Sequence, residues 1–241
     1  MKHFKTFRKC FVLAAFFTSS LIASAGTFED FFSAAKLDNE SVMVGLTLRG
    51  FDLNTVDPRG DSALLIAVRE GSRKVALFLL EQPSVKVEAR NPKGESPLML
   101  AALKGDLDMA RRLIQRKAEV NKPGWTALHY AASNTTQASQ EMVRLLLEHH
   151  AYIDAQSPNG STPLMMAARY GSPEAVKLLI QEGADPTLSN QLGLTAKDFA
   201  VQGRRQNSIE LMDAGLARWA ARQKSTTVPV QPNRWPSALP R

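Results

Sequence analysis

A pair of residues, Gly-x-Ser or Gly-x-Thr, recurs along this chain at nearly regular intervals. The pairs are Gly60/Ser62, Gly94/Ser96, Gly124/Thr126, Gly160/Thr162 and Gly193/Thr195. Successive hydroxyl residues are 34, 30, 36 and 33 positions apart. Such a period indicates that one small unit of structure is repeated in tandem, and this constrains the fold more than composition does.

Residues 157–185 show the unit most clearly. Thr162 can accept a free N–H group at a helix start, and Pro163 has the fixed φ that suits the first helical position. Apolar residues at helical spacing follow, and Gly171 is predicted to end this helix in a left-handed conformation. A second amphipathic helix follows directly and is predicted to end at Gly183.

Neither helix of the unit is long enough to be stable alone, so neighbouring units must stack. The segments STPLMMAARYG, ESPLMLAALKG, GWTALHYAA and GDSALLIAVREG resemble the ankyrin repeat, which is a turn followed by two helices. The resemblance implies an all-α solenoid of helix-turn-helix units with short β-turn fingers. We expect one domain of about six such repeats over residues 26–222.

The two ends of the repeat region depart from the pattern. Residues 28–54 keep two short helical patterns but lack the opening signature, and residues 193–200 resemble the start of a terminal ankyrin repeat. Both are interpreted as caps, because a terminal repeat faces water on one side. A closing helix is predicted over residues 205–221, and the Pro-containing segment 223–241 is predicted to be a disordered tail.

The fourth repeat differs from the others in two places. Its turn, residues 121–124, is short, and residues 133–140 insert three extra polar residues between the two helices. Neutral drift of a surface loop is one interpretation. The other is that the short finger exposes Trp125 beside Tyr130 and creates a local pocket.

Residues 1–25 have the pattern of a secretory signal peptide. A basic start is followed by an apolar run from Cys10 to Ile22 and by the small residues Ala23-Ser24-Ala25. We expect cleavage after Ala25 and a periplasmic or secreted protein. An uncleaved membrane anchor is the alternative, but the apolar run is shorter than the roughly 20 residues that span a bilayer.

Removal of this segment would change the chemistry of the chain. The single cysteine, Cys10, would be lost, so the mature chain would fold without disulfides. Four of the 30 Lys and Arg and none of the 23 Asp and Glu lie in residues 1–25, so 26 against 23 would remain and the net charge would fall from +7 to +3. We therefore expect no nucleic-acid partner. No other stretch is apolar enough to cross a membrane, so we expect no membrane insertion after cleavage, and we expect a monomer.

The sequence offers little for catalysis. His129 lies in the repeat signature and resembles a structural bridge between the turn and its own helix. His149 and His150 are adjacent on a helix, so they point apart and make a poor metal site without a third ligand. We expect no cofactor, no metal and no enzymatic activity.

The remaining candidate for function is the concave face that stacked ankyrin repeats present, formed by fingers and inner helices. Aromatic and long side chains are typical of interface anchors, although packing between repeats would also explain the apolar ones. The predicted partner-binding residues are Arg59, Ile66, Glu70, Lys93, Leu100, Lys104, Trp125, Tyr130, Asn134, Asn159, Met166 and Tyr170. The hypothesis is an exported, non-enzymatic scaffold that binds another protein. The alternatives are an inhibitor or immunity-type partner of an extracytoplasmic enzyme, and a weak metal-binding protein or enzyme that uses His149 and His150.

Overall fold

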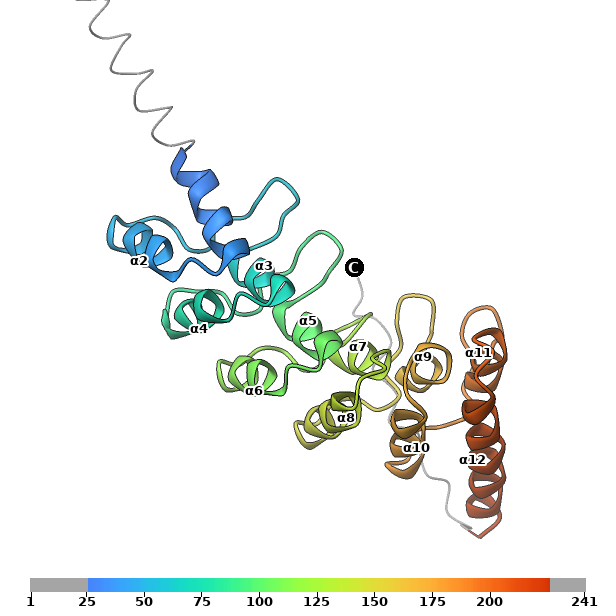
Figure 1. Cartoon of the computed structure of the whole chain (residues 1–241). Helices are drawn as coiled ribbons and strands as arrows, with labels where there is room; N and C mark the ends of the chain where they lie inside the picture. The colour runs from blue at the N-terminus through green and yellow to red at the C-terminus, as the bar shows by residue number, and fades with distance from the viewer. Residues whose placement is uncertain (1–25, 226–241) are drawn as a thin grey trace, which may run out of the picture. The chain divides into compact units, whose positions relative to one another are not determined.

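The computed structural model describes residues 26–225, and its helices follow one another in antiparallel pairs (Figure 1). The predicted signal peptide, residues 1–25, and residues 226–241 of the predicted tail lie outside the described residues. The chain contacts divide into two compact units, one up to Asn91 and the other from Pro92. The expectation of a single domain over residues 26–222 stays a prediction.

Unit 1 contains the first two repeats. Its helices are 26–37, α2 (Glu40–Leu48), α3 (Ala63–Glu70) and α4 (Arg73–Glu81). The side chain of Asn39 accepts the N–H of Val42 and so caps α2. Phe31 is fully buried, and its ring centroid lies 4.6 Å from that of Phe51. The two short helices predicted for the first repeat are therefore present and enclose an aromatic core.

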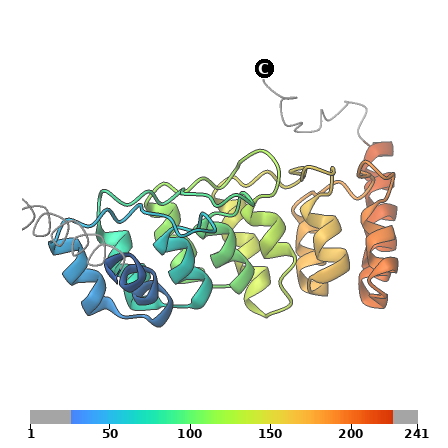
Figure 2. The same ribbon diagram turned by 90° about the horizontal axis from the view of Figure 1, so that it is seen from above.

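Unit 2 contains four further helix pairs. They are α5 (Pro97–Lys104) with α6 (Leu107–Gln115), α7 (Ala127–Ala132) with α8 (Ala138–Glu148), α9 (Pro163–Tyr170) with α10 (Pro173–Gln181), and α11 (Ala196–Gln202) with α12 (Gln206–Ser225). The first helices of these pairs pack on one another in an inner layer, and the second helices form an outer layer. Figure 2 shows the loops that precede the inner helices of this unit gathered along one side.

The repeated hydroxyl residues cap the inner helices. Ser62, Ser96 and Thr162 accept the N–H of the residue three positions on, at 3.2, 3.4 and 3.4 Å. These bonds satisfy one of the free donors at each helix start, so the N-termini lie where the sequence predicts them.

The glycines at the ends of the inner helices play two different roles. Gly71 and Gly105 are left-handed, with φ of 83° and 71°, as expected of a C-terminal stop. The same prediction for Gly171 is wrong, because its φ is −80° and its ψ is −168°. A Cβ atom at Gly171 would lie 2.1 Å from the main-chain oxygen of Ala132. This glycine therefore permits close approach of two repeats and does not reverse the chain direction.

The closing helix is longer than predicted. It runs over Gln206–Ser225, so residues 223–225 of the predicted tail are helical. Met212 is fully buried, as expected of an apolar position in the predicted helix.

Short turns connect the helices, and residues 26–225 contain no β-strand. The turns contain only isolated bridges, between Val56 and Ser62 and between Ser189 and Thr195. Within residues 26–225, none of the helices combines the length and hydropathy of a membrane-crossing segment. The predicted all-α class of repeated helix pairs with short turn fingers is confirmed.

Candidate functional site

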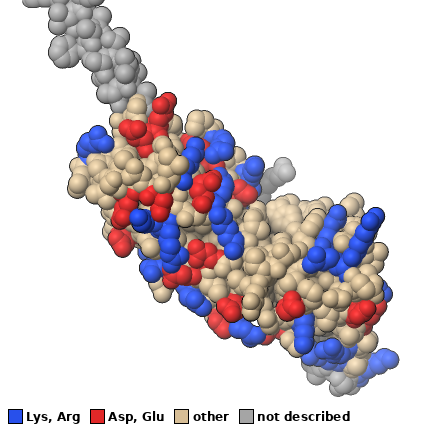
Figure 3. All heavy atoms as spheres, in the orientation of Figure 1, with Lys and Arg blue, Asp and Glu red and all other residues tan. Residues whose placement is uncertain are grey.

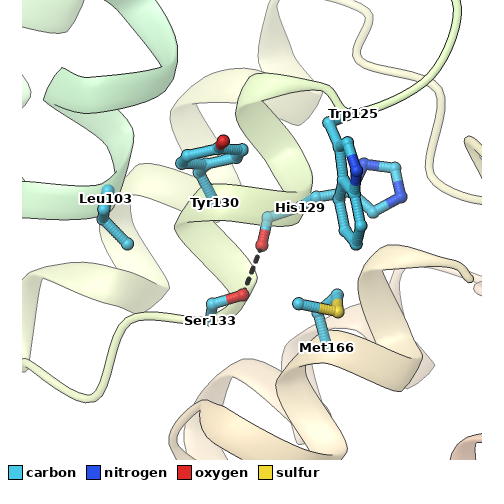
Figure 4. A pocket seen from close by; sticks show the side chains of 6 residues that line it. All are labelled: Leu103, Trp125, His129, Tyr130, Ser133 and Met166. Carbon is cyan, nitrogen blue, oxygen red and sulfur yellow. Dashed lines mark hydrogen bonds between the residues drawn. The ribbon is translucent and has the colours of Figure 1, made fainter. Parts of the chain in front are cut away.

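A cavity of about 230 Å³ opens on the inner-helix side of unit 2. Its walls come from the ends of α5 and α7, the finger before α7, and the middle of α9 (Figure 4). The lining residues are Leu103, Trp125, His129, Tyr130, Ser133 and Met166. Figure 3 shows a largely uncharged area over the inner helices of this unit, with Lys and Arg side chains beside it.

Hydrogen bonds at both ring nitrogens hold His129 in the wall of this cavity. Its Nδ1 accepts the main-chain N–H of Thr126 at 3.2 Å, so Nε2 carries the proton and donates to the main-chain oxygen of Ser161 at 2.9 Å. The side chain is 0% exposed, and burial lowers its pKa from 6.5 to about 4. The imidazole is neutral at neutral pH and joins two repeats, which confirms a structural role and extends it to the next repeat.

Trp125 lines the cavity, and its ring contacts the ring of this histidine. The two ring centroids are 5.2 Å apart at an interplanar angle of 75°, an edge-to-face contact. Trp125 and Tyr130 are both half-buried. Burial raises the pKa of the Tyr130 hydroxyl, and the negative charge of the nearby Glu95 carboxylate raises this pKa further. The two aromatic side chains are thus held in place while part of each surface stays open.

The insert in the fourth repeat forms part of the scaffold behind the cavity. Asn134 donates from Nδ2 to the main-chain oxygen of Leu103 at 2.7 Å and accepts the N–H of Thr136 at 2.6 Å. Ser139 donates to the main-chain oxygen of Ala131 at 2.9 Å. The bond to Leu103 fixes the insert to the preceding repeat. Because Asn134 is only 6% exposed, it offers almost no surface to a partner.

The structure brings together three of the predicted binding residues, Trp125, Tyr130 and Met166. Leu103 and Ser133 were missed. Each occupies the eighth position counted from the Ser or Thr that caps its inner helix, three residues after the predicted residue Leu100 in α5 or Tyr130 in α7. Positions three apart share a helix face, so this spacing would have found them.

Other predicted residues of unit 2 lie outside this cavity. Tyr170 is 44% exposed, with the guanidinium carbon of Arg169 5.1 Å from its ring centroid. Lys93, Lys104 and Asn159 are exposed. Leu100 is 5% exposed and belongs to the core, since the packing of its neighbours leaves it no free surface.

Unit 1 contributes the remaining predicted residues. Arg59 and Glu70 are exposed, and Arg59 pairs with Asp57 at 3.2 Å. Ile66 is 1% exposed and is a core residue. Because a buried side chain cannot contact a partner, Ile66, Leu100 and Asn134 are removed from the candidate surface.

The histidine pair lies at an exposed helix end. His149 and His150 are exposed at the end of α8, and the main-chain oxygen of His150 accepts a bond from Asn121 Nδ2 at 2.7 Å. Among residues 26–225, no group of three or more His, Cys, Asp or Glu is placed to hold a metal ion.

Comparison with known sequences gives the family. A model of three ankyrin repeats matches residues 31–123, 83–157, 116–190 and 138–215. The chain belongs to the ankyrin-repeat family. Ankyrin repeats mediate protein–protein binding, and the predicted repeat type is confirmed.

Relatives of this ankyrin-repeat chain are diverse. The p105 subunit of nuclear factor NF-kappa-B from Mus musculus is 35% identical over 149 residues, which are 58% of this chain and 15% of the relative. An ankyrin repeat-containing protein of Treponema pallidum is 29% identical over 175 residues, 72% of this chain and 47% of the relative. The chain thus spans less than half the length of these curated relatives.

Two solved bacterial structures resemble the fold. An ankyrin repeat domain from Acinetobacter baumannii matches with a TM-score of 0.63 at 25% identity, over 77% of this chain and 96% of that one. A chain in the complex of the Bd0816 predatory endopeptidase of Bdellovibrio bacteriovorus with the immunity protein Bd3460 also has a TM-score of 0.63, at 29% identity, over 76% of this chain and 96% of that one.

Proposed function

We propose that this chain is an exported, non-enzymatic ankyrin-repeat scaffold that binds another extracytoplasmic protein. Contact is made through the face around Trp125, Tyr130 and Met166. The observation that carries the proposal is the cavity of about 230 Å³ lined by these side chains, which are fixed from behind and partly open in front.

The energetics of interfaces favour this face. Aromatic residues in a partly enclosed site are typical binding anchors, because they bury a large apolar area with little loss of side-chain freedom. The hydrogen bonds of His129 and Asn134 hold the walls before a partner arrives, which lowers the entropic cost of binding. An apolar side chain of the partner would fill the cavity.

Export is tested first, because it decides where the partner is sought. The full-length chain is expressed in its own host, the extracytoplasmic fraction is isolated, and the N-terminus of the recovered protein is sequenced. A mature chain that starts at Gly26 supports the proposal. A chain that keeps Met1 and stays with the cytoplasmic fraction contradicts it.

Binding is then tested with a matched pair of variants. Trp125→Ala/Tyr130→Ala removes both aromatic anchors, and Tyr152→Ala removes an aromatic side chain that is 46% exposed outside the cavity. A partner captured from the extracytoplasmic fraction is purified and titrated against each variant. We expect the double variant to lose at least about thirtyfold in affinity, since even one anchor contributes about 2 kcal/mol or more, and we expect little change for the control.

The second candidate function is inhibition of an enzyme in the same compartment. It is favoured by the likeness to a chain in the endopeptidase–immunity protein complex. In that case the captured partner is an enzyme, and adding this chain at equal concentration abolishes its activity. A captured enzyme that stays fully active, or a partner without enzymatic activity, favours the scaffold.

A further inference from the structure

The described part of the chain, residues 26–225, contains seven methionines, and six of them are buried. These six are 0% or 2% exposed, and they are Met43, Met99, Met109, Met142, Met165 and Met212. Met166 is the exception, because it is partly exposed and lines the cavity around Trp125. Solvent therefore reaches one methionine in residues 26–225, and this methionine lies at the proposed binding face.

Met165 and Met166 are neighbours in α9 with opposite surroundings. Met165 is 0% exposed, and its sulfur accepts the main-chain N–H of Thr162 at 3.4 Å. Met166 faces a different direction, because consecutive residues of a helix project about 100° apart. Figure 4 shows its side chain extending from α9 toward Trp125. The two residues thus place the same chemical group in two environments, one in the core and one in the cavity.

A thioether that meets solvent is open to oxidation by peroxides. The sulfur lone pair attacks one oxygen of hydrogen peroxide and the O–O bond breaks. The proton on the transferred oxygen moves to the departing oxygen, which leaves as water. Sulfur loses two electrons and the peroxide gains two, so the products are methionine sulfoxide and water. Access of the peroxide to the sulfur decides which methionine reacts.

A sulfoxide at Met166 would make an apolar wall of the cavity polar. Its oxygen is a hydrogen-bond acceptor, and burial of an acceptor without a donor is unfavourable. Three donors in the lining are already engaged: Ser133 Oγ bonds to the main-chain oxygen of His129 at 2.8 Å, His129 Nε2 to that of Ser161, and the Tyr130 hydroxyl to the Glu95 carboxylate. None of these three is free for the new oxygen.

The consequence for a partner is the same whichever donor the oxygen finds. If the oxygen holds a water molecule, an apolar side chain of the partner must displace that water to enter the cavity. If the indole N–H of Trp125 donates to it, the aromatic anchor itself is engaged. In both cases the partner loses part of the apolar contact that makes the cavity a binding site.

We propose that Met166 is a site of selective oxidation by peroxides, and that its sulfoxide weakens partner binding at the cavity around Trp125. The first half rests on exposure, whereas the second half rests on the proposed function. Oxidation and binding are then linked in both directions. A partner seated over Met166 shields the sulfur, and a sulfoxide disfavours the partner.

The first half is tested by treating the purified chain with hydrogen peroxide and following each methionine by peptide mass spectrometry. Met165 and Met166 share one tryptic peptide, so fragment ions are used to separate them. We expect Met166 to react at least about tenfold faster than each of the six buried methionines. Equal rates at Met165 and Met166, or a faster reaction at any of the six, would show that the proposed selectivity is wrong.

The fluorescence of Trp125 reports the change in the cavity without a partner. We expect its emission to move to longer wavelength as the sulfoxide forms, because a polar group and water then lie beside the ring. Met166→Leu keeps an apolar side chain of similar volume without the sulfur and should show no such shift. Trp125→Phe should also lack it. The absence of a shift in wild type, or an equal shift in Met166→Leu, contradicts a sulfoxide in the cavity wall.

The second half compares the affinity of each protein before and after peroxide. Catalase removes the peroxide before the purified partner is added, so only this chain is oxidised. We expect oxidation to weaken binding by wild type at least about tenfold, and to leave the affinity of Met166→Leu at its own untreated value. Bound partner should also slow the oxidation of Met166. An oxidised wild type that binds as tightly as before would overturn the proposal.

Failure of the proposed function gives a different result. If untreated wild type binds no partner, the scaffold function and the effect of oxidation on it are both wrong, whereas selective oxidation is still decided by mass spectrometry and by Trp125 emission. If the partner binds and oxidation of Met166 leaves its affinity unchanged, the scaffold function stands and the second half of the proposal is wrong.

Discussion

The imidazole of His129 and the main-chain oxygen of Ser161 are joined across a repeat boundary by a hydrogen bond of 2.9 Å. The histidine belongs to α7, whereas Ser161 lies in the finger before α9. This bond holds the finger of one repeat against the inner helix of the one before. It also keeps a wall of the aromatic cavity in place, so stability and binding share one residue.

His129 should make folding sensitive to acid. Its pKa is lowered from 6.5 to about 4 by burial, so between these pH values the unfolded chain takes up a proton that the folded chain does not. Its contribution is complete above about pH 6.5 and is lost as the pH falls to about 4. The loss is on the order of 3 kcal/mol at about 1.4 kcal/mol per pKa unit. Urea unfolding measures the free energy of unfolding of wild type and of His129→Gln at several pH values in this range, and wild type should lose more stability toward low pH than the variant does. The same dependence on pH in both proteins would contradict the prediction.

Asp154 should act in the opposite direction. Burial raises its pKa to about 6, although it accepts the N–H of Asp185 at 3.1 Å. The unfolded carboxyl ionises more readily than the folded one, so this group destabilises the protein above about pH 6. Asp154→Asn keeps an acceptor without the charge and should stabilise by about 1–2 kcal/mol at pH 8, with no gain near pH 3. An equal effect at both pH values in urea unfolding would show that charge is not the cause.

Gly105 should tolerate no side chain. Its φ is +71°, and a Cβ atom would lie 2.9 Å from Cβ of Ala138 in the insert. Gly193 has a similar φ of +74° but open space within 4 Å. Gly105→Ala and Gly193→Ala share the backbone strain, of about 1 kcal/mol, and only the first adds a steric clash of about 1–3 kcal/mol. Equal unfolding midpoints for the two variants would mean that the insert does not pack tightly on Gly105.

Leu178 should be a strong contributor to the outer layer. It is 2% exposed in α10, so replacement by Ala removes buried apolar surface and leaves a cavity. We expect a loss of about 2–5 kcal/mol in the free energy of unfolding. The exposed neighbour Lys177 serves as control, and Lys177→Ala should change stability by about 0.5 kcal/mol or less. Denaturation with urea compares them, and similar values for the two would place Leu178 outside the core.

The sequence alone determined the local structure of this protein. Ser62, Ser96 and Thr162 start helices because the groups they cap lie only three residues away in the chain.

The tertiary structure decided which side chains are available. Tyr130 and Met166 stay partly open, whereas Leu100 and Ile66, at the same repeat position, are buried. Gly171 and Asn134 likewise depend on atoms more than 30 positions away, at Ala132 and Leu103. Exposure and close approach are set by neighbouring repeats, whose packing no single repeat encodes.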